Sequence, residues 1–145
     1  MQYVEYGAHN SQTVILLHGG GLSWWNYREV TQLLADKYHV VLPILDGHAD
    51  SDAPFTSIED NAARLVAYID KHHGGSVYAV GGLSLGGQIA VEMLTQRSDI
   101  CRFVPRTWII RMNGNGAASI CIPKNVNPAT TISFSPTREK PSPPC

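Results

Sequence analysis

Short apolar runs alternate with amphipathic stretches over most of the first hundred residues, and this alternation constrains the fold more than any other feature. Runs of four to eight apolar, β-branched-rich residues are typical of strands buried on both faces of a sheet. They occur at 13–17, 38–45 and 76–80. Apolar residues spaced three and four apart predict helices. These patterns cover about 24–36, 56–73 and 88–96. The order predicts an α/β fold, a parallel β-sheet with flanking helices.

The ends of the predicted helices carry recognisable signals. Ser23 occupies the position of a helix N-cap before the first helix. Thr56 and Glu59 have the spacing of a capping box, in which each side chain satisfies a free backbone N–H. Gly74-Gly75 predicts the end of that second helix. In the first helix, the residues expected on one apolar face are Trp25, Val30, Leu33 and Leu34.

The composition changes abruptly near residue 101. Residues 1–100 contain 5 Lys+Arg and 11 Asp+Glu, whereas residues 101–145 contain 6 Lys+Arg and the single acid Glu139. Seven of the nine prolines and all three cysteines also lie in the second part. We therefore predict two regions: a folded part over 1–101, and a disordered tail over 102–145 that does not look like native sequence of the same protein. A shift of reading frame between 101 and 104 is a hypothesis that accounts for all of these changes.

The segment Gly82-Leu83-Ser84-Leu85-Gly86 matches the pattern G-x-S-x-G between a predicted strand and a predicted helix. In that context, a tight reversal after the strand forces strained dihedrals on the serine, while the glycines let the two backbones pass. The hydroxyl of Ser84 is then lifted above the sheet, and the N–H of Leu85 points at the same space. The alternative is an ordinary glycine-rich turn with a solvated serine.

A second glycine cluster, His18-Gly19-Gly20-Gly21, follows the first predicted strand. Glycines let backbone N–H groups turn inward, so this loop is a candidate second half of an oxyanion hole. Gly20 is the preferred donor, with Gly19 or Gly21 as alternatives, and an ordinary tight turn is the simpler interpretation. We expect His18 to anchor the loop by hydrogen bonds rather than to act as a general base.

Taken together, His18-Gly-Gly-Gly, Asp46-Gly-His-Ala-Asp-Ser-Asp52 and Gly82-Leu-Ser-Leu-Gly-Gly87 resemble the α/β-hydrolase fold family, in order and spacing, over about residues 3–100. The resemblance implies that Ser84 is the nucleophile and that Gly20 and Leu85 donate the oxyanion hydrogen bonds. It also implies that the predicted strands lie centrally in the sheet, and that 3–6 is part of an earlier strand.

The match to the family pattern stops after Ser84. In the family, the catalytic acid and histidine follow the nucleophile. Here all six histidines precede Ser84, and the carboxylates after it are Glu92, Asp99 and Glu139. Glu92 lies within the predicted elbow helix, Asp99 is too close to the elbow, and Glu139 lies in the proline-rich tail. We therefore interpret the chain as a truncated α/β-hydrolase fold, the N-terminal half only, with an incomplete triad.

The expected activity is ester-type acyl transfer through a serine, with little turnover by this chain alone. A serine without a base is a weak nucleophile, and triad-deficient templates keep about 10³–10⁴ of acceleration over water. His48, in a loop at the same predicted sheet edge as Ser84, is an alternative base. Two other functions stay open: a non-catalytic interaction module, and a phosphate- or nucleotide-binding domain. The latter is disfavoured because Trp24 replaces the last glycine of G-x-G-x-x-G.

Composition limits the partners. The net charge of −1 gives no reason to expect nucleic acid or an anionic membrane. We expect a small-molecule substrate if the chain is active, and self-association through an exposed sheet edge. No cofactor or metal is predicted, because the spacing of Cys101, Cys121 and Cys145 matches neither a metal knuckle nor a redox pair. The first five residues do not resemble a signal peptide, so a cytoplasmic location is expected.

Overall fold

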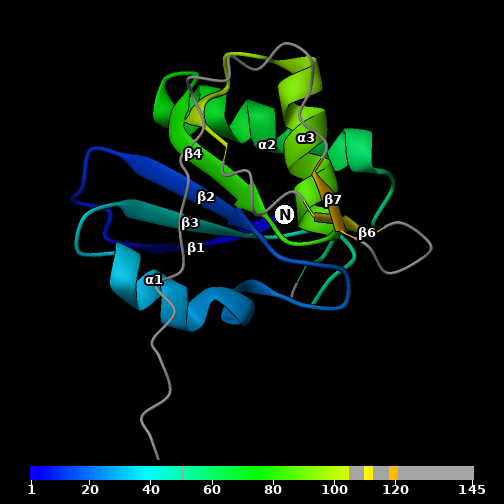
Figure 1. Cartoon of the computed structure of the whole chain (residues 1–145), viewed down its shortest axis with the longest axis horizontal. Helices are drawn as coiled ribbons and strands as arrows, with labels where there is room; N and C mark the ends of the chain where they lie inside the picture. Colours follow the sequence, from blue (N-terminus) through cyan, green and yellow to red (C-terminus); the bar gives the residue numbers. More distant parts are fainter. Residues whose placement is uncertain (50, 105–109, 113–117, 121–145) are drawn as a thin grey trace, which may run out of the picture.

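The computed structural model describes residues 1–49, 51–104, 110–112 and 118–120 (Figure 1). It contains a five-stranded mixed sheet in the order β1-β3-β2-β4-β5 and a two-stranded sheet of β6 and β7. The strands are β1 Gln2–Tyr6, β2 Thr13–Leu17, β3 His39–Ile44, β4 Val77–Gly82, β5 Cys101–Phe103, β6 Ile110–Met112 and β7 Ala118–Ile120. The helices are the 3-10 helix η1 Trp24–Tyr27, α1 Arg28–Leu34, α2 Ile58–His73 and α3 Leu85–Gln96.

The predicted α/β architecture with a parallel sheet is confirmed for the four strands β2 to β5, which all pair in parallel. The edge strand β1 differs, because it runs antiparallel to β3, with Gln2 opposite Ile44 and Tyr6 opposite Val40. The sheet is therefore mixed, with one antiparallel strand at its edge. The expected strand at 3–6 is present as β1.

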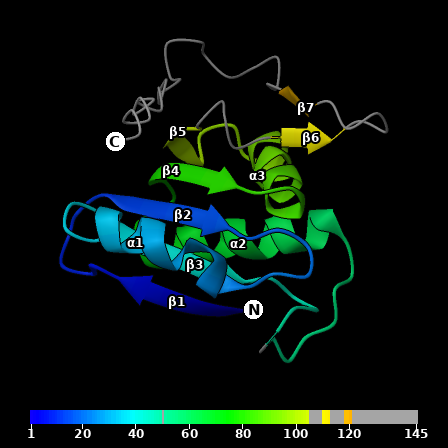
Figure 2. The ribbon, with the colours of Figure 1, turned by 60° about the horizontal axis from the view of Figure 1, so that its bottom comes forward.

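Alternate residues of the central strands feed two separate apolar cores. In β2, Ile15 and Leu17 pack on the face covered by α2 and α3, whereas Val14 and Leu16 pack on the face covered by η1 and α1. Figures 1 and 2 show α1 on one side of the sheet and α2 with α3 on the other. Each fully buried side chain of this size contributes roughly 1.5–3 kcal/mol, so both faces hold the helices on.

The topology makes a switch point beside β2. From β2 the chain passes through α1 to β3, which pairs with β2 along one of its edges. It then returns through α2 to β4, which pairs with β2 along its other edge. In an open α/β sheet, the crevice at the carboxyl ends of two strands that diverge in this way is the usual place for a ligand. The loops after β2 and β4 meet there.

The first predicted helix differs from the structure. Residues 24–27 form a 3-10 turn before α1, which ends at Leu34, and the Ser23 side chain makes no capping hydrogen bond. Trp25 and Leu33 were expected on the apolar face but are 47% and 79% exposed. The break at Tyr27 explains the error, because the change in helical geometry rotates residues on either side of it onto different faces.

The second predicted helix is confirmed, with its cap one residue later than expected. Ser57, not Thr56, is the N-cap of α2, and its hydroxyl accepts the N–H of Asp60 at 3.0 Å. The helix ends where the sequence predicted, at Gly74 in the left-handed conformation with φ 65°. The Ser and Thr side chains are adjacent and chemically similar, so the sequence pattern did not separate them.

The predicted boundary between 101 and 102 falls within β5, which continues to Phe103. β5 pairs with the first half of β4, so β4 is not an edge strand of the five-stranded sheet. Within the predicted tail, β6 and β7 form an antiparallel pair. The other residues beyond Val104 lie outside those described, so the disordered tail and edge self-association stay predictions.

Across the described ranges, no helix combines the length and apolar character needed to cross a bilayer. The cytoplasmic location expected from the sequence stays a prediction.

The cap of α2 gives a stability prediction with a built-in control. Ser57→Ala removes the hydroxyl that accepts the Asp60 N–H, and is expected to lower the free energy of unfolding by about 1 kcal/mol. Thr56→Ala, at the exposed neighbouring position, is expected to change it by less than about 0.5 kcal/mol. Urea unfolding followed by circular dichroism measures both. A larger loss for Thr56→Ala than for Ser57→Ala would contradict this assignment.

Candidate functional site

Ser84 lies in the sharp turn between the end of β4 and the start of α3. Its dihedral angles are φ 51° and ψ −111°, and its side chain is exposed. Non-glycine residues rarely take positive φ, and such strained residues cost of order 1–3 kcal/mol and gather at functional sites. The strand–turn–helix context that the G-x-S-x-G motif needs is therefore present, with the strained serine facing outward.

The glycines of the motif are required by close backbone contacts. A Cβ on Gly82 would overlap the carbonyl group of Gly86 and lie 2.6 Å from the Gly87 nitrogen. A Cβ on Gly86 would overlap the carbonyl oxygen of Leu17 and lie 2.6 Å from that of His18. All of these obstacles are backbone atoms that no rotamer change can move. Glycine at both positions is what allows α3 to begin directly against β2.

The glycine loop after β2 lies against Ser84. A Cβ on Gly19 would be 3.6 Å from the Cβ of Ser84, and a Cβ on Gly20 would be 3.9 Å from a methyl group of Leu85. Leu85 opens α3, so its N–H has no acceptor within the helix. Among the described residues, neither that N–H nor the one of Gly20 donates a backbone hydrogen bond. The N–H groups of Gly20 and Leu85 are thus without a backbone acceptor and lie in segments next to the serine.

His18 anchors this loop, as the sequence suggested. The ring is fully buried, its Nε2 accepts the backbone N–H of Leu45 at 3.1 Å, and its Nδ1–H donates to the Gly19 carbonyl at 2.9 Å. Burial lowers the pKa of His18, with a smaller effect of His48, against the opposing bond to Gly19. With both nitrogens engaged in the neutral ring, His18 is not placed to take a proton from Ser84.

Tyr27 supports the turn by a hydrogen bond to β2, a role that the sequence analysis missed. Its hydroxyl donates to the Leu17 carbonyl at 3.0 Å, and the same carbonyl accepts the N–H of Leu83 at 2.9 Å. The side chain is 8% exposed, and burial raises its pKa to about 12 against a hydrogen bond from the Leu83 backbone. Tyr27 therefore ties η1 to the paired carboxyl ends of β2 and β4, next to the turn that holds Ser84.

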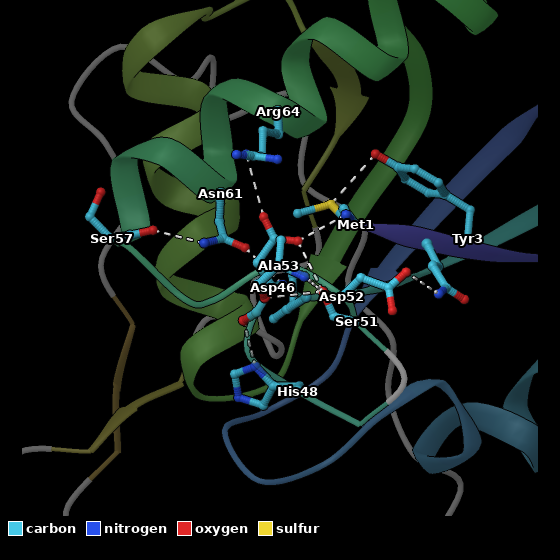
Figure 3. A network of polar contacts seen from close by, with 12 residues as sticks. Met1, Tyr3, Asp46, His48, Ser51, Asp52, Ala53, Ser57, Asn61 and Arg64 are labelled. Atoms are coloured by element: carbon cyan, nitrogen blue, oxygen red, sulfur yellow. Dashed lines mark hydrogen bonds and ion pairs between the residues drawn. The ribbon is translucent and has the colours of Figure 1, made fainter.

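Asp46, in the loop after β3, is a buried acidic residue with several partners. Figure 3 shows its buried carboxylate meeting the α-amino group of Met1 at 2.9 Å and Arg64 Nε at 3.4 Å. The hydroxyl of Ser51 donates to it at 3.2 Å, and the Asp46 N–H donates to Asn61 at 3.2 Å. The loop after β3 is thereby fastened to α2. Sequence separation hid these partners, since none lies within four residues of Asp46.

His48 reaches the same sheet edge as Ser84 but makes no hydrogen bond with it among the described residues. Its Nδ1–H donates to the Asp46 carbonyl at 3.0 Å, and its ring packs edge-on against His18 at 5.2 Å. His39 and His73 lie at the opposite end of the parallel strands, with their ring centroids 5.6 Å apart. The alternative base proposed from the sequence thus lies near the site without contacting the serine.

The acids that follow Ser84 are engaged elsewhere within the described ranges. Glu92 accepts a hydrogen bond from Gln96 on the surface of α3, and Asp99 pairs with Arg97 at 3.1 Å. Glu139 lies outside the described residues. The described part of the chain therefore provides a strained serine and two free N–H donors, without a base bonded to the serine.

These features can be compared with known proteins. The model of the "Alpha/beta hydrolase family" matches residues 14–132, more than half of the chain. The chain belongs to the alpha/beta hydrolase family. This match includes the three segments that carried the resemblance: the glycine loop after β2, the loop after β3 and the turn before α3.

Individual relatives of this alpha/beta hydrolase have different activities in their names. The chain is 32% identical over 113 residues to a soluble epoxide hydrolase of Corynebacterium sp., covering 77% of this chain and 38% of that protein. It is 29% identical over 133 residues to Lipase 1 of Psychrobacter immobilis, covering 90% and 40%. A crystal structure of a putative alpha/beta hydrolase from Desulfitobacterium hafniense aligns with a TM-score of 0.65 and 27% identity, over 72% of this chain and 42% of that one.

The chain matches about a third to two fifths of the length of its curated relatives. Membership of the family and the hydrolase fold are therefore shown, and the reaction and substrate are matters for proposal.

Gly86 gives the sharpest test of the backbone crossing. Gly86→Ala forces a methyl group into the Leu17 and His18 carbonyls, so we expect a loss of at least about 3 kcal/mol in the free energy of unfolding, or failure to fold. Gly20→Ala, where the added Cβ meets only ordinary contacts, is expected to cost less than about 1 kcal/mol. Thermal unfolding compares them; equal losses would be inconsistent with the crossing described.

The hydroxyl of Tyr27 can be tested separately. Tyr27→Phe removes the bond to the Leu17 carbonyl while keeping the ring, and is expected to cost about 1 kcal/mol in unfolding free energy. Tyr6→Phe, at an exposed ring, serves as the matched control and is expected to be within about 0.5 kcal/mol of the parent. Urea titration measures both. No loss for Tyr27→Phe would show that this hydroxyl does not support the turn.

Proposed function

We propose that this chain carries the nucleophile and oxyanion hole of a serine hydrolase that acts on carboxylic esters. One observation carries the proposal: Ser84 is exposed at positive φ, with the unbonded N–H groups of Gly20 and Leu85 beside it. A serine lifted in this way, facing two free donors, suits attack on a carbonyl whose oxygen becomes negative. A lipase among the relatives is consistent with ester substrates.

The chemistry follows from these groups. The Ser84 oxygen attacks the ester carbonyl carbon as its hydroxyl proton passes to water, and the carbonyl oxygen takes the negative charge between the N–H groups of Gly20 and Leu85. Collapse of this intermediate breaks the carbon–oxygen bond to the alcohol, which takes a proton from water as it leaves, and an acyl group stays on Ser84. Water then attacks the acyl carbon, releasing the carboxylic acid and restoring the Ser84 hydroxyl. The N-terminal end of α3 adds a favourable field at the developing oxyanion. Each interaction strengthens as charge forms, which is the condition for lowering the barrier.

The proton of the Ser84 hydroxyl has no acceptor among the described residues. Both nitrogens of His18 are occupied, and His48 is turned toward Asp46 and His18. We therefore infer that the described part alone supports slow acylation, at the level of the oxyanion hole and binding, about 10³–10⁴ over water. An added base should then raise the rate at Ser84.

Covalent labelling tests this proposal. A fluorophosphonate probe is expected to modify the chain once, at Ser84, slowly, and faster when free imidazole is added as an external base. Mass spectrometry of the intact chain and of its peptides follows the reaction. Ser84→Ala is expected to abolish labelling, and Ser98→Ala, at an exposed serine after α3, is expected to leave it unchanged.

The alternatives predict different labelling. A non-catalytic interaction module would leave Ser84 unlabelled with or without imidazole, and that result would contradict the proposal. Labelling that persists in Ser84→Ala would also contradict it. If imidazole gives no acceleration while Ser84 labels rapidly, the chain holds its own base, and the inference of slow acylation is wrong. The nucleotide-binding alternative has less support, because the glycine loop leads into a 3-10 turn instead of an α-helix.

A further inference from the structure

Four side chains form a continuous line of polar contacts at the amino ends of the parallel strands, the end of the sheet opposite Ser84. Glu5 of β1 meets Nε2 of His39 at 2.8 Å. Nδ1 of His39 lies 3.4 Å from the hydroxyl of Thr13, and that hydroxyl lies 3.3 Å from Nδ1 of His73 at the end of α2. The line therefore joins β1, β3, β2 and α2 in that order.

The line ends in a buried atom without a partner. Nε2 of His73 is shielded from solvent, and within the described residues no group forms a hydrogen bond with it. A ring nitrogen in this position is tolerated more easily as a bare lone pair than as an N–H, because a buried donor without an acceptor loses its whole hydration.

With both rings neutral and Nε2 of His73 bare, counting protons gives the direction of each bond. The Glu5 carboxylate accepts, so His39 carries its proton on Nε2 and its Nδ1 is an acceptor. The single hydroxyl proton of Thr13 goes to that Nδ1, so the Thr13 oxygen must accept from Nδ1–H of His73. His73 is left with a bare Nε2. Both rings are neutral in this arrangement, and they hold opposite tautomers.

An added proton does not fit this line. If His39 takes it on Nδ1, the Thr13 hydroxyl must turn toward His73, whose own proton then moves to the buried Nε2. If His73 takes it, Nε2 becomes an N–H directly. In both cases one proton enters and one N–H appears at the shielded atom without an acceptor.

We propose that Glu5, His39, Thr13 and His73 form a proton-sensitive lock that fastens the end of α2 to the sheet when both histidines are neutral and loosens when either ring takes up a second proton. The lock is independent of the chemistry at Ser84. It makes part of the stability of the fold depend on pH, at the amino ends of the parallel strands and away from the nucleophile.

Charged and titratable groups from several elements surround His73. They are Glu5 of β1, His39 of β3, and Tyr68 and His72 of α2. Arg102 of β5 lines a surface cleft together with His73. Burial, with smaller effects of His39 and His72, holds the pKa of His73 below its usual value, while Glu5 opposes them. Partial burial of Glu5 opposes ionisation, but hydrogen bonds from Tyr68 and His39 outweigh it and lower the pKa of Glu5.

The sign of the pH effect follows. A histidine whose pKa is lower in the folded state stabilises the fold fully above its unfolded pKa, about 6.5, and this stability is lost as the pH falls toward the folded value. The stability from Glu5 is lost only below its unfolded pKa of 4.5. The interval from pH 7.5 to 5.5 therefore reports on the histidines.

Two measurements on the full chain test the lock. Nitrogen-15 NMR of the histidine rings at pH 7.5 is expected to show His73 protonated on Nδ1 with a bare Nε2, and His39 with the opposite tautomer. The thermal midpoint is expected to fall by about 4 °C between pH 7.5 and 5.5. His73→Asn, whose side-chain amide keeps a donor for Thr13 and does not titrate, is expected to reduce this fall to the part that comes from the buried His18, whose pKa is also lowered. His9→Asn, the same change at an exposed histidine, is expected to keep it.

The proposal fails if His73 carries its proton on Nε2 at neutral pH, or if His73→Asn melts with the same pH dependence as the parent. If His73→Asn does not fold, the ring tautomers of the parent chain decide the question alone. Neither result depends on whether Ser84 reacts with a fluorophosphonate.

Discussion

The structure depends on the close approach of two backbones, where the start of α3 passes the end of β2. Gly86 meets the carbonyl oxygens of Leu17 and His18 so closely that no side chain fits between them. The Leu17 carbonyl also accepts hydrogen bonds from Leu83 and Tyr27. This crossing makes the turn at Ser84 so sharp that the serine takes a positive φ. The packing of α3 against β2 therefore maintains the strained backbone at Ser84, which places the serine hydroxyl above the sheet.

The carboxyl and amino ends of the parallel strands carry different polar groups. At the carboxyl ends of β2 and β4, the N–H groups of Gly20 and Leu85 make no backbone hydrogen bond and lie near Ser84, which suits a site for developing negative charge. At the amino ends, Glu5 and His73 belong to a line of polar side chains that fastens three strands to α2. The apolar residues of β2 lie between the two ends and separate them.

Local sequence signals predicted the central strands, the second and third helices and the strand–turn–helix context of Ser84, because each depends on residues close together in the chain. Features set by distant partners were missed. Asp46 is buried because Arg64 and the Met1 amine neutralise it, and Tyr27 breaks the first helix to reach the Leu17 carbonyl. Neither leaves a periodic signal. The boundary at 101–102 was placed by composition, which does not register the pairing of β5 with β4.

We propose above all that the strained turn and the glycine loop together form an oxyanion hole at Ser84. A crystal structure of the chain with a phosphonate bonded to Ser84 tests it most directly. Ser84 is expected to keep its positive φ, and one phosphonyl oxygen is expected to lie about 2.7–3.1 Å from the backbone nitrogens of Gly20 and Leu85. An adduct whose oxygens face solvent, away from both nitrogens, would contradict it.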